Sequence, residues 1–328
     1  MSFNRLVADD FVVSTDSITA GLWGDSSTPN LSTFITSSAQ AAGSSGNFYL
    51  NVFSAGTSAA PTELEFAVTY GNSVGGGSLL YDPAVAEKSP SSTIYGSYRT
   101  LVLGDENATF SFGGVTSSDF WAISIDRNRY KESLFPGSLT LIISGSDAAA
   151  GGGMLSLTDN SQIVTTTTFN DAGRVFQIVS GSAGTVFTGV NNNGYSLASG
   201  SYGFFLPDIA TLLLNPRAIT AGNTGVSKSF ADIKPVTTAN TDGNNPGILI
   251  RAISASANPS PNPALPFTLN SQENITSDFV FVRPRSSEYN YSSNPSFISG
   301  STGEVLYNSF INNPQTYMTT VGLYNDTN

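Results

Sequence analysis

Phe120-Trp121-Ala122-Ile123-Ser124-Ile125-Asp126 is the stretch of the sequence that decides the fold. It is a short run rich in aromatic and β-branched residues, which favour strands. Similar runs recur along the chain, closed by glycine, asparagine, serine or proline, the residues that form turns. They span residues 48–53, 63–70, 98–103, 139–143, 174–179 and 202–208. The sequence therefore predicts a mainly β protein, with antiparallel β-sandwich-type domains and few short helices.

Helix signals are sparse. Residues 16–22 predict a short helix because a capping Asp or Ser precedes a short run. Residues 83–88 predict another, with Pro83 at the first helical position. The run at 98–103 mixes polar and apolar residues in both alternating sets, which predicts a strand buried on both sides.

Two changes in composition predict domain boundaries. Residues 147–153 combine alanines with three glycines and indicate a flexible crossing. Residues 258–266 hold four prolines within eight positions, which favours an extended segment. We expect a discontinuous β domain made of residues 1–146 and 258–328, with an inserted β unit at 147–257. One continuous sandwich is the alternative.

The chain of 328 residues has no cysteine and no histidine. It therefore lacks imidazole and thiolate groups, which are the usual acid–base and nucleophilic groups and the ligands that zinc, iron and copper prefer. Carboxylate, lysine and tyrosine chemistry would remain available to an enzyme. The composition favours a protein that is not an enzyme, with no cofactor and no metal site.

The charge of the chain limits the kinds of molecule that we expect it to bind. The net charge is −11 and only 11% of residues are charged. Nucleic acids and anionic membranes need clustered lysine and arginine, so we expect neither as a partner. The beginning of the sequence shows no signal peptide, and no apolar run reaches the roughly 18 residues of a membrane helix. These features predict a protein made in the cytoplasm.

Three motifs resemble functional sites. Residues 71–75 match the Gly-x-Ser-x-Gly nucleophile pattern, but without a histidine they predict a glycine-rich hairpin loop. Glu63 and Glu65 would share one strand face, as a glycosidase pair might, although an exposed strand edge explains them better. Residues 240–245 resemble a calcium loop without its distal glutamate and predict a turn.

Arg127, Arg129 and Lys131 form the densest group of basic residues. If the preceding strand continues, these three side chains share one face. Arginine is well suited to pair with a carboxylate, either on a neighbouring subunit or within the chain. They are candidate interface residues, and a solvated face is the alternative.

Tyrosines cluster towards the end of the chain. Tyr289, Tyr291 and Tyr317 are candidate interface anchors, because tyrosine is enriched at protein interfaces. Packing in a β core would explain them equally well.

Several segments together resemble a known family. They are residues 18–25, 127–137, 288–297 and 313–326, with looser matches at 173–176 and 202–204. They are similar to a family of virion structural proteins of T-even-type contractile-tailed phages that infect marine cyanobacteria. The resemblance implies a non-enzymatic component of the virion in the tail or baseplate region, which binds other virion proteins and copies of itself.

Two other functions remain open from the residues alone. One is a head or neck decoration protein, and the other is a host-surface or carbohydrate-binding β adhesin, since hydroxyl-rich sandwiches with aromatic loops often hold sugars. Relatives in the family continue past the turn at 323–326 into another apolar strand. Either this member of the family is shorter, or the last strand is supplied otherwise, for example by a neighbouring subunit that adds a strand at the exposed edge.

Overall fold

The computed structural model describes residues 7–22, 35–36, 49–53, 64–78, 82, 84–144, 154–187, 202–220, 233–237, 242–256, 267–282, 292–314, 320 and 322. The protein is mainly β and its paired strands run antiparallel. The predicted fold class is confirmed. The chain divides into a main unit, Ser17–Ile275, and a terminal unit, Met1–Asp16 with Thr276–Asn328.

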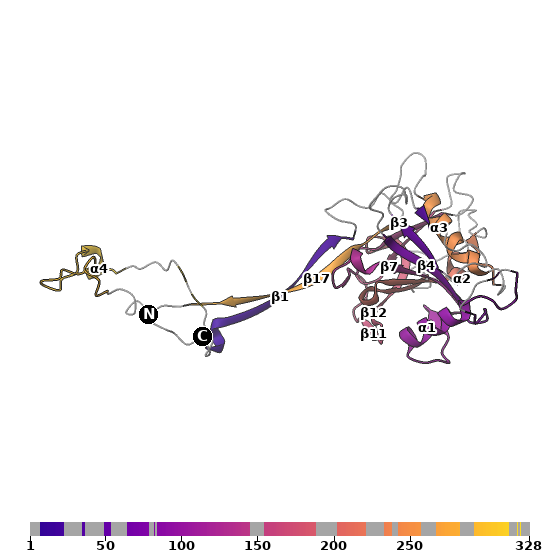
Figure 1. The fold of residues 1–328 in the computed structure, drawn as a ribbon, viewed down its shortest axis with the longest axis horizontal. Helices are drawn as coiled ribbons and strands as arrows, with labels where there is room; N and C mark the ends of the chain where they lie inside the picture. The colour runs from indigo at the N-terminus through magenta and orange to yellow at the C-terminus, as the bar shows by residue number, and fades with distance from the viewer. Residues whose placement is uncertain are drawn as a thin grey trace. The chain divides into compact units, whose positions relative to one another are not determined.

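A large sheet dominates the main unit (Figure 1). Its strand order is β16-β9-β10-β12-β14-β15-β7-β4-β3-β2, and β11 and β13 both pair with β12. The strands are β2 (Ile35–Thr36), β3 (Tyr49–Phe53), β4 (Leu64–Asn72), β7 (Asp119–Ile125), β9 (Thr140–Ser144), β10 (Met154–Asp159), β11 (Thr168–Asn170), β12 (Gly173–Ser182), β13 (Thr185–Val186), β14 (Gly203–Leu206), β15 (Thr211–Leu214) and β16 (Phe267–Thr268).

Smaller elements complete the fold. The remaining strands are β1 (Phe11–Gly21), β5 (Phe110–Phe112), β6 (Val115–Ser117), β8 (Ser133–Leu134) and β17 (Asn270–Val280). The α-helices are α1 (Ser91–Leu103), α2 (Pro216–Ile219), α3 (Asn245–Ser256) and α4 (Asn308–Asn312). Single 3-10 turns occur at Ala8–Asp10, Arg127–Arg129, Pro207–Ile209 and Asp242–Asn244.

The central strands are buried on both faces. In β7, Phe120 and Ala122 pack into a cluster with α1, whereas Trp121, Ile123 and Ile125 pack into the larger core with α3. Leucines in β15 and phenylalanines in β14 divide between the same two clusters. Successive strand residues point to opposite faces, so a strand covered on both sides is apolar throughout. This explains the run at 120–125, which is apolar except at Ser124.

The sheet curls until its distant strands meet. Phe66 of β4 contacts Phe267 of β16 edge to face, with ring centroids 5.4 Å apart. Six strands separate β4 from β16 in the sheet order, and in a flat sheet they would lie about 34 Å apart. Helix α3 contacts β9, β3, β4 and β7, and so packs against both arms of the curl. The two layers of the predicted sandwich are therefore halves of one curled sheet.

The helices occur where the sequence did not predict them. Residues 98–103, predicted as a strand, form the second half of α1, which ends at Gly104 with a φ of 65°. Residues 16–22, predicted as a helix, lie almost entirely in β1, where pairing with β17 outweighs the local capping signal. In the predicted helix at 83–88, residues 84–87 form turns and a bend, and Lys88 is not helical.

The units differ from the domains predicted from composition. Strands β10, β12, β14 and β15 come from the predicted insert at 147–257, yet they lie between β9 and β7 in the same sheet. The observed boundaries fall instead within β1 and within β17. Both predicted linkers, 147–153 and 258–266, lie entirely outside the described residues. Composition does not reveal which strands pair across a long separation.

Candidate interaction surface

The terminal unit contains one end of a two-stranded ribbon. We call residues 11–16 of β1 and 276–280 of β17, with the adjoining Phe281, the terminal ribbon. The Phe281 amide donates a hydrogen bond to the Asp10 carbonyl at 2.8 Å. Continuing this antiparallel register places Val12 opposite Phe279 and Phe11 opposite Val280. Opposite residues share a face, so both faces of the terminal ribbon carry apolar side chains.

These apolar side chains are exposed to solvent. The exposed fraction is 63% for Val13, 52% for Phe279 and 50% for Phe281. Phe11, Val12 and Val7 are exposed to a similar degree. Large apolar side chains gathered on one small element mark sites of interaction, whereas scattered single ones do not.

No described residue of the terminal unit is buried. Its described part contains one small aromatic group, in which Phe297 contacts Phe310 and Tyr307 at centroid distances of 5.3 and 6.3 Å. Tyr307 remains 54% exposed, and α4 next to it buries no residue. A two-stranded ribbon needs a third strand or a packed helix for independent stability. The terminal unit therefore presents apolar surface without a core of its own in its described part.

The described part of the terminal unit is also acidic. It carries Asp9, Asp10, Asp16, Asp278 and Glu304 and no lysine or arginine. The sequence places Arg5, Arg283, Arg285, Glu288 and Asp326 in the rest of that unit. None of the five described carboxylates forms an ion pair with a described residue. The exposed surface is thus both apolar and negatively charged.

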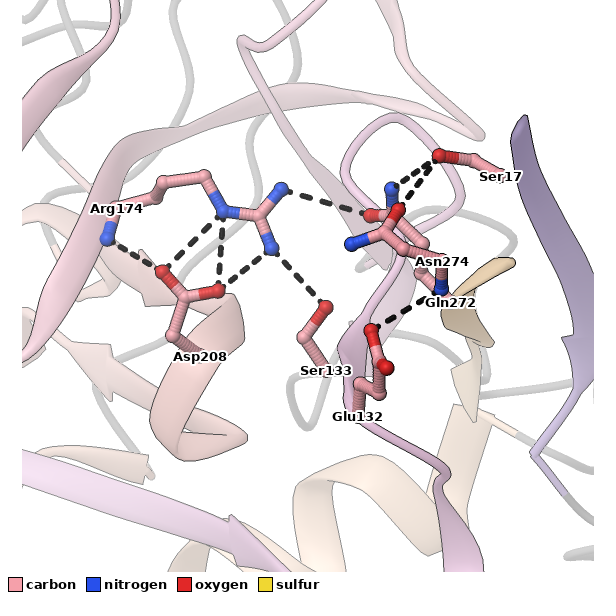
Figure 2. Close-up of polar contacts among 7 residues, drawn as sticks. All are labelled: Ser17, Glu132, Ser133, Arg174, Asp208, Gln272 and Asn274. Atoms are coloured by element: carbon pink, nitrogen blue, oxygen red, sulfur yellow. Dashed lines mark hydrogen bonds and ion pairs between the residues drawn. The ribbon is translucent and has the colours of Figure 1, made fainter. Parts of the chain in front are cut away.

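A polar network holds β17 to the main unit (Figure 2). The Arg174 guanidinium on β12 donates to both oxygens of Asp208, with Nη2 2.6 Å from Oδ1 and Nε 3.2 Å from Oδ2. The Arg174 backbone amide also donates to Asp208 Oδ2 at 2.7 Å. Nη2 reaches Ser133 Oγ of β8 at 3.0 Å, and Nη1 reaches Gln272 Oε1 of β17 at 3.5 Å. One arginine therefore links three strands.

The network continues into β1. Gln272 Nε2 donates to Ser17 Oγ at 3.0 Å, and Ser17 Oγ donates to Asn274 Oδ1 at 2.9 Å. The Asn274 amide donates to Glu132 Oε2 at 3.0 Å (Figure 2). We call these seven residues, Ser17, Glu132, Ser133, Arg174, Asp208, Gln272 and Asn274, the anchor network. It fixes the ends of β1 and β17 that belong to the main unit.

Asp208 is ionised in this arrangement. Burial alone would raise the pKa of Asp208, but hydrogen bonds from the side chain and backbone of Arg174, together with its charge, hold that pKa below its usual range. Forked arginine–carboxylate pairs combine two charge-assisted hydrogen bonds with a defined orientation. The pair is suited to holding β12 against the turn at Pro207–Ile209.

The predicted face of Arg127, Arg129 and Lys131 does not form. Strand β7 ends at Ile125, and Arg127–Arg129 form a 3-10 turn that Asp126 caps by accepting a hydrogen bond from the Asn128 amide. A 3-10 turn has three residues per turn, so side chains two positions apart no longer point to the same side. The three cations therefore have separate surroundings.

Arg129 is an internal residue. Its Nη2 forms an ion pair with Glu65 Oε1 at 3.0 Å, and its Nε donates to the Leu64 carbonyl at 3.1 Å. The side chains of Arg129 and Glu65 are 14% and 2% exposed. This is the ion pair between elements that the sequence allowed. Glu65 is thus buried and paired rather than on an exposed strand edge, while Glu63 lies outside the described residues.

Arg127 and Lys131 face solvent. Arg127 lies over the Tyr130 ring, 4.7 Å from its centroid, and its Nη1 donates to the Tyr130 carbonyl at 2.7 Å. Neither cation forms an ion pair with a described residue. Their assignment to an interface stays a prediction. Tyr289, Tyr291 and Tyr317 lie outside the described residues.

A buried polar cluster lies beyond the end of β4, where the Gly-x-Ser-x-Gly pattern occurs. Gly71 and Asn72 belong to β4, residues 73–75 form a turn, and residues 76–78 after it are not helical.

Two buried carboxyl groups lie in this region. Asp242 is fully buried and accepts hydrogen bonds from Ser89 and Ser91. Burial raises the pKa of Asp242, and the two serines and nearby backbone amides only partly offset this. Tyr70 donates to Asp119 at 2.8 Å, and burial raises the pKa of both groups.

The structure also bears on the hypotheses of a sugar-binding platform, a metal site and a membrane helix. Trp121 is buried and donates its Nε1 to the Asn245 carbonyl, so it cannot serve as an exposed platform for a sugar ring; Trp23 lies outside the described residues. Within the described ranges, acidic side chains do not gather in groups of three that could hold a metal ion. No helix in the described part is long and apolar enough to cross a membrane.

Sequence reasoning missed the terminal ribbon. Its signal was present in Phe11-Val12-Val13 and Phe279-Val280-Phe281-Val282, which are dense in strand-forming residues. Comparison with known proteins adds no further assignment: no family model, no curated protein and no solved structure matched the chain.

Proposed function

We propose that the protein is a structural subunit of a phage virion, in its tail or baseplate region, and that it binds neighbouring subunits through the terminal unit. The observation that carries the proposal is a unit with exposed apolar side chains on both ribbon faces and no buried residue in its described part. Such a unit gains its packing by binding a partner.

The assignment to a phage particle rests on the amino-acid sequence. The segments at 18–25, 127–137, 288–297 and 313–326 resemble virion structural proteins of contractile-tailed phages. The low content of charged residues suits a surface that neighbouring subunits cover in an assembly, because charged residues are depleted at the centres of interfaces. Other virion proteins and further copies of the chain are the proposed partners.

The anchor network attaches the two strands of the terminal ribbon to the large sheet. Strands β1 and β17 each belong partly to the terminal unit and partly to the main unit, and the network holds their main-unit ends. There, Arg174 connects β17 and β8 to β12 of the large sheet. Strands held by several hydrogen bonds and an ion pair resist displacement better than strands held by a single contact.

The test replaces one apolar side chain of the ribbon with a charge. In a phage whose genome encodes the chain, Phe279→Asp should reduce the amount of the protein in purified particles by about tenfold or more, because burying an unpaired carboxylate at an interface is costly. Phe169→Asp is the matched control, since Phe169 on β11 is 70% exposed but lies in the main unit. Quantitative mass spectrometry of the particles measures both.

Two outcomes would overturn the proposal. The wild-type chain could be absent from purified particles, in which case it is not a virion component. Alternatively, Phe279→Asp and Phe169→Asp could be incorporated equally, in which case the terminal ribbon is not the binding surface. Circular dichroism of the isolated variants checks that both remain folded.

A further inference from the structure

We infer that the terminal unit of one copy docks onto the exposed cations Arg127 and Lys131 of a second copy, so that the chain assembles head to tail. The inference rests on the proposed function and names the partner of the same surface. It joins two observations, an acidic apolar unit and two exposed cations elsewhere in the chain. The described carboxylates of the unit and these two cations form no ion pair with a described residue.

The acidic surface needs a cationic partner. Asp9, Asp16 and Asp278 lie on or beside apolar side chains that an interface would cover, and the described part of the terminal unit offers them no cation. A carboxylate buried without a partner loses its hydration without compensation. A docking surface that supplies lysine or arginine would therefore suit these carboxylates.

Arg127 and Lys131 supply the positive charge, and the flanking carboxylates of Asp126 and Glu132 accept hydrogen bonds from backbone amides. Arg127 and Lys131 are exposed, and the partly buried Tyr130 ring lies beneath the Arg127 guanidinium. The hydrogen bond from Arg127 Nη1 to the Tyr130 carbonyl holds the side chain in place and leaves its other donors available. A guanidinium that is already oriented loses little conformational entropy when it pairs with a carboxylate.

Charge also determines the symmetry of the contact. If two terminal ribbons met each other, the described carboxylates of both copies would face one another, and like charges at an interface oppose binding. A contact between different surfaces of the two copies avoids this repulsion. Such a heterologous contact builds a closed ring or a filament rather than a two-fold dimer.

Charge reversal on each surface tests the inference. One variant carries Asp9→Lys and Asp278→Lys, and the other carries Arg127→Glu and Lys131→Glu. Arg129 is left unchanged because its removal would leave Glu65 buried without its ion pair. Sedimentation velocity of the purified full-length chains measures association. The matched control reverses two exposed charges elsewhere in the main unit, Glu106→Lys and Arg251→Glu.

Head-to-tail docking predicts a specific pattern. Wild type and the control associate, and association weakens at about 1 M salt, where charges are screened beyond about 3 Å. Each charge-reversed variant alone associates at least about tenfold more weakly than wild type, because like charges then meet. An equimolar mixture of the two variants regains association, because each contact again joins opposite charges.

Other results would overturn the inference. A monomeric wild type, unchanged association in either variant, or a mixture that fails to associate while both variants are folded would each exclude this contact. If the wild type is monomeric but particle incorporation still depends on Phe279, the proposed function stands and the partner is a different protein. If the chain self-associates as described but is absent from particles, the proposed virion role fails while this contact stands.

Discussion

Asp242 is a residue through which the stability of the protein should depend on pH, because its side chain is buried. It is fully buried in the 3-10 turn that precedes α3, and its hydrogen-bond donors are the hydroxyls of Ser89 and Ser91 together with nearby backbone amides. Burial opposes ionisation, so the pKa of Asp242 in the folded protein lies above its value in the unfolded chain. Folding therefore favours the protonated acid.

The sign of the resulting pH dependence follows from linkage. At pH values between the pKa of Asp242 in the unfolded chain and its pKa in the folded protein, the folded state binds more protons. The contribution of Asp242 to the free energy of unfolding is therefore complete below about pH 4 and is lost as pH rises through the pKa of the folded protein. Asp242→Asn removes this contribution. We predict that the free energy of unfolding of the variant, relative to wild type, increases as pH rises from about 4 towards 7. Urea denaturation at a series of pH values measures it.

Ser91→Ala is the control for this prediction. It keeps the acid but removes a donor that lowers the pKa of Asp242, so the stability of this variant should depend on pH at least as steeply as that of wild type. If Asp242→Asn and wild type gave parallel curves over this range, Asp242 would not titrate differently in the folded and unfolded chain.

At the scale of elements, the close pairing of β14 with β15 depends on a glycine. Gly203 pairs with Leu214 and has a φ of 150°, and a Cβ atom there would lie 2.0 Å from the Leu213 carbonyl oxygen. Strands β14 and β15 lie between β12 and β7 in the large sheet. A side chain at this position would separate strands in the middle of the sheet.

We predict that Gly203→Ala lowers the free energy of unfolding by about 3 kcal/mol or more, from backbone strain and steric overlap. Gly96→Ala is the matched control, because a Cβ at Gly96 in α1 meets nothing within 4 Å. Replacing that helical glycine should stabilise the protein by about 0.5–1 kcal/mol. Denaturant titration compares the two. Equal stability of Gly203→Ala and wild type would show that the sheet accommodates the methyl group.

At the scale of the whole molecule, the two units differ in how their strands are protected. The main unit buries β4, β7, β14 and β15 almost completely, whereas the described residues of the terminal unit are exposed or half-buried. Local opening is least costly where few apolar side chains are buried. The free chain should therefore have regions of very different stability.

We predict that the backbone amides of the terminal ribbon exchange with solvent at least about a hundredfold faster than those of β7 in the isolated chain, and slow down on assembly. Hydrogen exchange with mass spectrometry measures both states. The amides of β7 act as the internal control, since assembly should leave their exchange unchanged. Equal protection of the ribbon and β7 in the isolated chain would mean that the terminal unit is stable without a partner.

The strands could be predicted from the sequence where burial left short runs dense in aromatic and β-branched residues. Residues 120–126 are the clearest case, and the runs at 48–53, 63–70, 139–143, 174–179 and 202–208 also contain strands. The run at 98–103 has similar composition but belongs to α1, which continues from Ser91 and ends at Gly104. Local composition could not separate these cases, because the helix begins before the apolar run.

The sequence by itself determined that the protein is built from strands, because aromatic and β-branched runs closed by turn residues allow little else. It also excluded chemistry that requires imidazole or thiolate groups, since the chain contains neither. Only the tertiary structure decided that Arg129 pairs with Glu65, that Arg127 and Lys131 face solvent, and that the terminal ribbon lacks a cover within the described residues. Contacts between distant residues and the exposure of a strand's faces arise from packing, which no local pattern of residues encodes.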